Sequence, residues 1–233
     1  MTITPHDAWC GEADCRSCSL RASVLFAGLA ETDFDLIHRP IDDYLVRTHQ
    51  AIYRAGDPGS AVFTIRSGLV KLVRYLPDGQ QRIVRLARGT DAVGLEAILG
   101  QSYQHDAIAL SDARVCRIPA EVVRQLDRKA SGLHDEVLRR WQRALNEADR
   151  WLTELSTGTA RQRVARLLLW LSEGGDDASC ELFTREDVGA MLGVTTETAS
   201  RVIAEFRRQG HLTQDSSGRI TCQRAALKKI AGD

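Results

Sequence analysis

Three cysteines lie close together near the start of the chain, where their side chains could bind a metal. Cys10, Cys15 and Cys18 fall within nine residues of a polar stretch, and three further cysteines are scattered along the chain. No apolar run is long enough to span a membrane, and the first residues lack a secretory signal, so we expect a cytoplasmic protein with reduced thiols. Thiolates bind both iron and zinc well. The clustering therefore predicts a metal site and leaves the metal open.

A second group of residues has the chemistry needed to bind DNA. Glu197, Ser200 and Arg201 are spaced three and four residues apart, so they share one face of a predicted helix. Arg binds guanine through two hydrogen bonds, Glu accepts from the amine of cytosine, and Ser can donate or accept. Thr195 and Thr196, at the start of this helix, are better suited to phosphate. The alternative is a solvated helix face with an internal Glu197–Arg201 pair.

The elements around these residues favour the DNA interpretation. Thr184 can cap a first helix, which Gly193 ends at a sharp turn, and a second helix follows over residues 196–209. A hairpin over residues 211–222, with a polar turn at 215–218, comes next. This order predicts a helix-turn-helix followed by a wing.

Alternating apolar residues predict short strands in the middle of the chain. Residues 69–75 and 81–87 have this pattern, and Pro77-Asp78-Gly79 predicts a hairpin turn between them. Residues 61–65 form an apolar, β-prone run before them, and residues 115–119 close the section. Several short strands with turns at this spacing predict a β-roll or jelly roll.

A long helix after the strands carries apolar residues at alternating intervals of three and four. That is a heptad pattern, which favours a two-stranded coiled coil and hence a homodimer; the alternative is a helix packed on its own domain. The residues of this seam are Leu138, Trp141, Leu145, Ala148, Leu152 and Leu155.

Three stretches of the chain resemble the CRP/FNR family of bacterial transcription regulators. Residues 193–201 are similar to the family's recognition helix in its FNR form, with the Glu-x-x-Ser-Arg pattern. Residues 115–119 resemble the end of the FNR sensor roll, where a cluster-ligating cysteine lies, and residues 91–98 resemble that roll's short helix.

The resemblance implies an α+β fold with an N-terminal β-roll of the cyclic-nucleotide-binding jelly-roll type, a long dimerisation helix and a C-terminal winged helix-turn-helix. The expected boundaries are 1–25 for a Cys-rich segment, 26–132 for the sensor roll, 133–157 for the dimerisation helix and 158–233 for the DNA-binding domain. The implied partners are double-stranded DNA carrying an inverted repeat of the TTGAT type, a second copy of the chain, and RNA polymerase. The region Leu76–Gly89 is the candidate surface for the polymerase.

With Cys116, the N-terminal cysteines supply the four thiolates that hold a four-iron, four-sulfur (4Fe-4S) cluster. The resemblance implies that oxygen, or nitric oxide, destroys this cluster. One feature departs from the family pattern, in which a pair of cysteines two residues apart precedes a third. Aligning Cys15 and Cys18 with the pair puts Val24 where the third is expected, so Cys10 takes its place. The alternatives are a zinc site, a haem, a small effector in the roll, or Cys116 as a small buried strand residue.

Other functional classes are disfavoured. The chain has no phosphate-binding glycine loop and no nucleophile motif, so we expect no enzymatic activity. The family's cyclic-nucleotide branch is disfavoured because the corresponding stretch, Gln104–Ala107, has no cation for a phosphate. Lys plus Arg and Asp plus Glu balance at 31 each, which neither favours nor excludes DNA. A redox or metal-storage protein would not need Glu197, Ser200 and Arg201.

Overall fold

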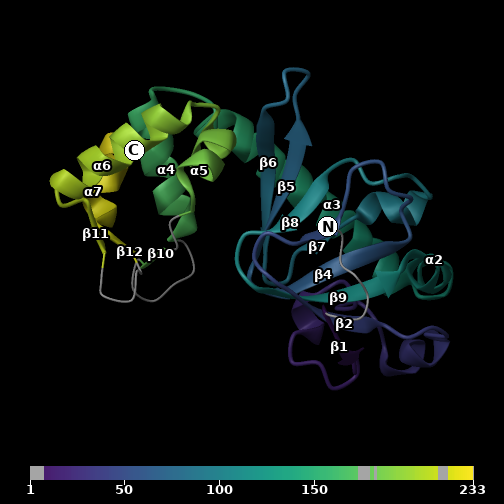
Figure 1. The fold of residues 1–233 in the computed structure, drawn as a ribbon. Helices are drawn as coiled ribbons and strands as arrows, with labels where there is room; N and C mark the ends of the chain where they lie inside the picture. Colours follow the sequence, from purple (N-terminus) through teal and green to yellow (C-terminus); the bar gives the residue numbers. More distant parts are fainter. Residues whose placement is uncertain (1–7, 173–178, 181–182, 215–219, 233) are drawn as a thin grey trace. The chain divides into compact units, whose positions relative to one another are not determined.

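The computed structural model describes residues 8–172, 179–180, 183–214 and 220–232 (Figure 1). The chain forms two compact units. One comprises Met1–Arg74 and Val84–Glu147, and the other Tyr75–Ile83 and Ala148–Asp233. Each unit has its own buried core, so each is described by itself.

The first unit is built on two antiparallel sheets, as predicted for a β-roll. One sheet has the strand order β1-β2-β9-β4-β7, and the other has the order β3-β8-β5-β6. The strands are β1 (Trp9–Glu12), β2 (Asp42–Val46), β3 (Ala51–Tyr53), β4 (Ala61–Ser67), β5 (Leu69–Tyr75), β6 (Gln81–Arg88), β7 (Ala92–Val93), β8 (Asp106–Ala109) and β9 (Ala113–Pro119).

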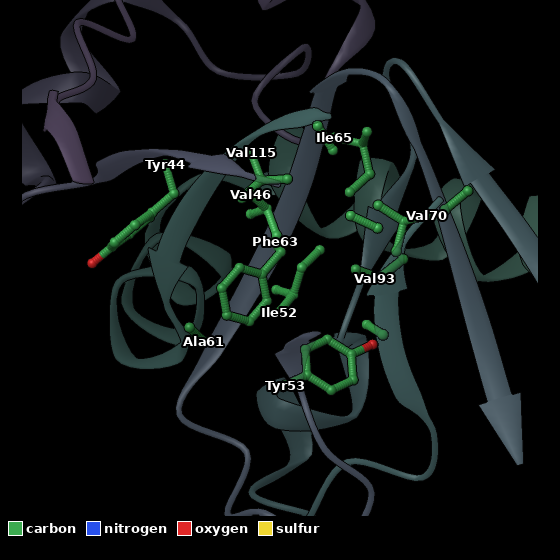
Figure 2. Close-up of a cluster of buried hydrophobic side chains, with 14 of the residues drawn as sticks. Tyr44, Val46, Ile52, Tyr53, Ala61, Phe63, Ile65, Val70, Val93 and Val115 are labelled. Carbon is green, nitrogen blue, oxygen red and sulfur yellow. The ribbon is translucent and has the colours of Figure 1, made fainter. Parts of the chain in front are cut away.

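A core of apolar side chains from both sheets stabilises the roll (Figure 2). Because side chains alternate along a strand, Phe63 and Ile65 of β4 and Val115 of β9 belong to this core. Their neighbours Val62 and Ile118 lie on the opposite face of the five-stranded sheet. The five-stranded sheet is therefore buried on both faces, and its second face is the one that carries Cys116.

A second core covers that outer face. Leu25, Phe26 and Leu29 of the N-terminal segment pack there with Leu126 and Leu133 of the helices that follow the roll. The helical elements that supply this layer are η2 (Glu31–Leu36), η3 (Leu95–Leu99), α2 (Ala120–Lys129) and α3 (Ser131–Arg150), and the short η1 (Arg21–Ser23) precedes them in the chain.

The N-terminal segment contains a strand that the sequence pattern does not predict. In β1, Trp9 pairs with Tyr44 and Gly11 with Asp43, so the register shifts around Cys10. Only four residues long and mostly exposed, β1 forms at the sheet edge because β2 offers its backbone groups, and its own sequence has no apolar alternation.

The second unit is a winged helix-turn-helix. Thr184 and Thr195 cap two successive helices by accepting from backbone N–H groups at Asp187 and Thr198, and Gly193 ends the first helix at φ 62°, as predicted. The predicted turn at 215–218 lies outside the described residues. The elements are η4 (Trp151–Leu155, a π-helical turn), α4 (Ala160–Leu171), β10 (Ser179–Cys180), α5 (Arg185–Leu192), α6 (Thr196–Arg208), β11 (Leu212–Gln214), β12 (Ile220–Cys222) and α7 (Arg224–Ala231).

Candidate functional site

Helix α6 has one buried face and one exposed face. Glu197, Ser200 and Arg201 are all exposed on the first turns of the helix. The helix is therefore held by its apolar side and presents three hydrogen-bonding side chains to solvent, which is the arrangement of a recognition helix. The buried face consists of Ala199, Val202, Ile203 and Phe206.

The turn before α6 is tight because small residues allow it. A Cβ atom on Gly189 would lie 2.8 Å from the carbonyl oxygen of Val194, so α5 needs a glycine there.

The pKa of the Glu197 carboxyl is held below its ordinary value. The main causes are hydrogen bonds from the backbone N–H of Glu197 and from the Thr195 hydroxyl, and the charge of Arg201 makes a smaller contribution. Glu197 is thus ionised and can accept hydrogen bonds at neutral pH.

Three of the four predicted cysteine ligands line one cavity. Cys15 and Cys18 of the N-terminal segment and Cys116 of β9 face this cavity together with Thr64 and Arg66 of β4. The structure therefore brings together residues that are separated by about one hundred positions in the chain. The rest of the wall consists of Leu20, Arg21, Val24, Leu25, Phe26, Ile41 and Ile118.

The fourth predicted ligand lies outside this cavity. Cys10 is exposed on β1, where its thiol donates to the carbonyl oxygen of Ala8 at 3.6 Å. Strand β2 separates β1 from β9, so the Cys10 and Cys116 backbones are two strand spacings apart, or about 10 Å. The structure thus gathers three of the four thiols and leaves Cys10 at the sheet edge.

The Cys15 and Cys116 thiols are protonated at neutral pH when no group is bound to them. Burial, followed by the proximity of Cys116 and Cys18, raises the pKa of Cys15 to about 12. Burial is also the largest cause that raises the pKa of Cys116 to about 11, and the nearby charge of Arg66 opposes it. A metal that binds here must displace protons.

A buried carboxylate lies beside Cys116. Asp43 pairs directly with Cys116 in the β2–β9 register, and its Oδ2 accepts from Arg66 and from Arg114, each at 2.8 Å. Asp43 Oδ1 is buried and has no hydrogen-bond partner within the described residues. The sequence does not predict this cluster, because the burial of Asp43 and Thr64 becomes visible only once the strands pair.

No group of three or more His, Cys, Asp or Glu side chains in the described part of the chain converges closely enough to hold one metal ion. In a four-iron cluster each cysteine binds a different iron atom, so the sulfurs need not converge on one point.

Comparison with known proteins matches two parts of the chain to known domain families. A family model for the cyclic nucleotide-binding domain matches residues 45–129, and one for the Crp-like helix-turn-helix domain matches residues 162–230. The chain belongs to the CRP/FNR family. It is therefore related to DNA-binding transcription regulators and not to enzymes, as the sequence predicts.

Individual relatives extend this CRP/FNR assignment along most of the chain. The fumarate and nitrate reduction regulatory protein of Vibrio cholerae is 28% identical over 225 residues, which is 94% of this chain and 90% of that protein. The anaerobic regulatory protein of Pasteurella multocida is 27% identical over 94% of this chain and 82% of its own length. The structure of FixK2 from Bradyrhizobium japonicum matches with a TM-score of 0.73 and 25% identity, covering 82% of this chain and 96% of that one.

In this CRP/FNR chain, helix α3 carries an exposed apolar stripe. Leu138 is 51% exposed, Leu145 57%, and Leu152 in the following turn 64%. Trp141 packs partly against the second core, Ala148 is half-buried, and Leu155 is buried within the chain. Of the predicted seam, the three leucines therefore present the most apolar surface to solvent.

The opposite side of α3 is joined to the cysteine-bearing segment. The buried Arg140 side chain donates to three oxygens: Nε to Glu136 at 2.6 Å, Nη1 to the Thr90 carbonyl at 2.6 Å and Nη2 to the Ser23 carbonyl at 2.8 Å. Thr90 has φ 79°, a left-handed conformation that is unfavourable for a β-branched residue.

Among the described residues, no helix is both long and apolar enough to cross a membrane.

Proposed function

We propose that this chain is a homodimeric regulator that binds an inverted repeat with half-sites of the TTGAT type. Glu197, Ser200 and Arg201 contact base edges in the major groove, and Thr195 and Thr196 contact phosphates. The support for this is the exposed face of α6 together with the tight turn before it. In a symmetric dimer the two recognition helices enter grooves one helical turn apart, which is about 34–36 Å.

The dimer forms along α3 and the turn that follows it. Leu138, Leu145 and Leu152 repeat every seven residues and are each more than half exposed, so a second copy of the helix buries them. Burying a leucine contributes about 1.5–3 kcal/mol, and the pair of stripes contains six such side chains. Trp141 and Ala148 flank the leucines and contribute the edges of the contact.

The cysteine cavity holds an oxygen-sensitive 4Fe-4S cluster in this proposal. Cys15, Cys18 and Cys116 supply three thiolates from the cavity wall, and Cys10 supplies the fourth from the edge strand β1. The chemistry of the residues suits such a group in two respects: the three thiols share one apolar cavity, and the buried hydroxyl of Thr64 beside them has no hydrogen-bond partner among the described residues. The cavity has a volume of about 30 Å³, so its wall must move outwards to admit the cluster. When bound, the cluster supplies the reaction with oxygen, which the relatives named for anaerobic regulation suggest as the signal.

The cysteine segment contacts the dimerisation helix at two points, one a hydrogen bond and the other a close backbone approach. Ser23, five residues after Cys18, accepts from Arg140. Gly28 meets Gly132 so closely that a Cβ atom on Gly28 would lie 2.2 Å from the Gly132 carbonyl oxygen. Any rearrangement of this segment on loss of the cluster therefore moves α3. This connection is the physical route by which the cluster controls the dimer.

The hairpin formed by β5 and β6 is the proposed surface for RNA polymerase. The turn at Leu76–Gln80 is closed by backbone hydrogen bonds, and Tyr75 and Leu76 are exposed beside it. Exposed apolar residues on a rigid hairpin suit a protein contact.

The observation that carries the proposed sensor is the shared cavity of Cys15, Cys18 and Cys116. The experiment is purification without oxygen of the wild-type chain and of three variants: Cys18→Ser, Cys116→Ala and, as the control, Cys222→Ser at a buried cysteine of the second unit. We expect about four iron and four sulfide per wild-type chain. We expect the two cavity variants to lose the iron and the control to keep it. Equal iron content in all four proteins would refute the cysteine site.

A further inference from the structure

Among the described residues that line the cysteine cavity, one carries a hydroxyl group, and it lies beside Cys116. Thr64 of β4 pairs directly with Cys116 of β9, and directly paired residues in an antiparallel sheet place their side chains on the same face. Both residues also line the cavity with Cys15 and Cys18. The hydroxyl is therefore next to the thiols and not on the side of the roll core.

This hydroxyl is buried without a hydrogen bond. Thr64 is 3% exposed, and its Oγ1 has no partner within the described residues. Burying an unpaired hydroxyl is unfavourable, and valine has the same shape without this cost. Val62, two residues earlier on the same face, packs in the apolar core beside Ile118. The fold alone would thus be served better by valine at position 64.

The other polar side chains on the cavity wall already have partners. Arg66 is paired with Asp43 at 2.8 Å. Arg21 is paired with Glu31 at 2.7 Å and donates to the carbonyl oxygen of Leu29. Each of these arginines has at least one partner, whereas the Thr64 hydroxyl has none within the described residues, so Thr64 is the donor that is ready to act on a group inside the cavity.

We propose that the Thr64 hydroxyl donates a hydrogen bond to a sulfur atom of the group held by Cys15, Cys18 and Cys116. The inference rests on the proposed cluster and deepens it by assigning a residue that tunes its stability. Hydrogen bonds to the sulfurs are among the factors that set the reduction potential of an iron–sulfur cluster, because they stabilise the more negative, reduced state. Thr64 is thus a positioning and tuning residue, and not a ligand.

Two substitutions at this site test the proposal, and each is measured with and without iron. Thr64→Val removes the hydroxyl and keeps the shape, whereas Thr64→Ser keeps the hydroxyl. Thr213→Val, on an exposed strand of the second unit, is the matched control. In metal-free protein we expect Thr64→Val to melt at the wild-type temperature or a few degrees higher, because it removes an unpaired buried group.

In iron-loaded protein we expect the opposite effect. The visible absorption of Thr64→Val should disappear in air about 2- to 10-fold faster than that of the wild type, the range for one hydrogen bond, and its reduction potential should fall. Thr64→Ser and Thr213→Val should behave as the wild type.

The outcomes separate the inference from the function on which it rests. If wild-type protein purified without oxygen contains no iron, the proposed cluster fails, and the role of Thr64 fails with it. If the wild type contains iron but Thr64→Val has the wild-type potential and air sensitivity, only the inference is overturned. A metal-free Thr64→Val protein that melts well below the wild type would also overturn it, because the hydroxyl would then have a partner within the fold.

Discussion

Replacing Arg140 with methionine should destabilise the first unit strongly. Arg140 lies on α3 with only 4% of its side chain exposed, and all three guanidinium nitrogens donate hydrogen bonds. Methionine has a similar length and fills the space, so the change removes the charge and the donors with little change in packing. Of its partners within the described residues, Glu136 would keep the largely exposed Arg139.

The expected magnitude follows from what is left behind. Removing one member of a buried ion pair costs about 3–5 kcal/mol, because the other charge stays buried without adequate compensation. For a chain of this size, 1 kcal/mol corresponds to about 2–4 °C, so the melting temperature should fall by about 6–20 °C. Arg139→Met breaks only an exposed interaction with the same Glu136 and should cost less than about 1 kcal/mol.

Urea unfolding of the two variants, followed by the intensity and wavelength of tryptophan fluorescence, measures this difference. The double variant Arg140→Met with Glu136→Leu should recover much of the loss, because it removes both charges. Adding Cys18→Ser to the wild type and to Arg140→Met tests the connection between the cysteines and α3. The substitution should weaken dimerisation in the wild-type background and have little effect in the Arg140→Met background. If Arg140→Met and Arg139→Met were equally stable, the structural argument would be refuted.

Three further changes have definite expected outcomes. Arg201→Ala should weaken binding to the inverted repeat by about 1–3 kcal/mol, or about 5- to 150-fold, without weakening binding to random DNA; equal losses on both would contradict base contact. Leu145→Glu should raise the dimer dissociation constant at least about tenfold in sedimentation experiments, and a wild-type value would exclude this stripe from the interface. In metal-free protein, alkylation of Cys15 and Cys116 should be slow at pH 7 and accelerate as the pH approaches 11–12, while exposed Cys10 reacts readily. Equal reactivity of Cys10, Cys15 and Cys116 at pH 7 would contradict the burial of Cys15 and Cys116. Because folding raises the pKa values of these two buried thiols, their contribution to the free energy of unfolding is complete below pH 9 and is lost as the pH rises towards 11–12.

Local chemistry made much of the fold predictable. Strand β5 has the predicted bounds Leu69–Tyr75, because alternation and a Pro-Asp-Gly turn act over a few residues. The helix-turn-helix was predictable for the same reason: Thr184, Gly193 and Thr195 specify the ends of α5 and α6 through capping and a left-handed turn.

Features that depend on distant parts of the chain were not predictable. Strand β1 exists because β2 lies beside it, and four polar or mixed residues carry no pattern of their own. The sequence grouped Cys10 with Cys15 and Cys18 by spacing, whereas the fold places Cys10 at the sheet edge and the other two in the cavity. The hydrogen bonds of Arg140 and the burial of the Thr64 hydroxyl also result from tertiary packing, so no local sequence pattern predicts them.

In the proposed mechanism, a cluster on the cysteine cavity controls DNA binding by the dimer. The most direct test is to purify the chain without oxygen and measure iron, sulfide, oligomeric state and affinity for a TTGAT inverted repeat, and then to repeat all four measurements on the same sample after air. We predict a coloured, iron-containing dimer that binds the repeat tightly, followed by parallel loss of colour, of the dimer and of specific binding. A colourless chain that binds the repeat equally well before and after air would contradict this mechanism.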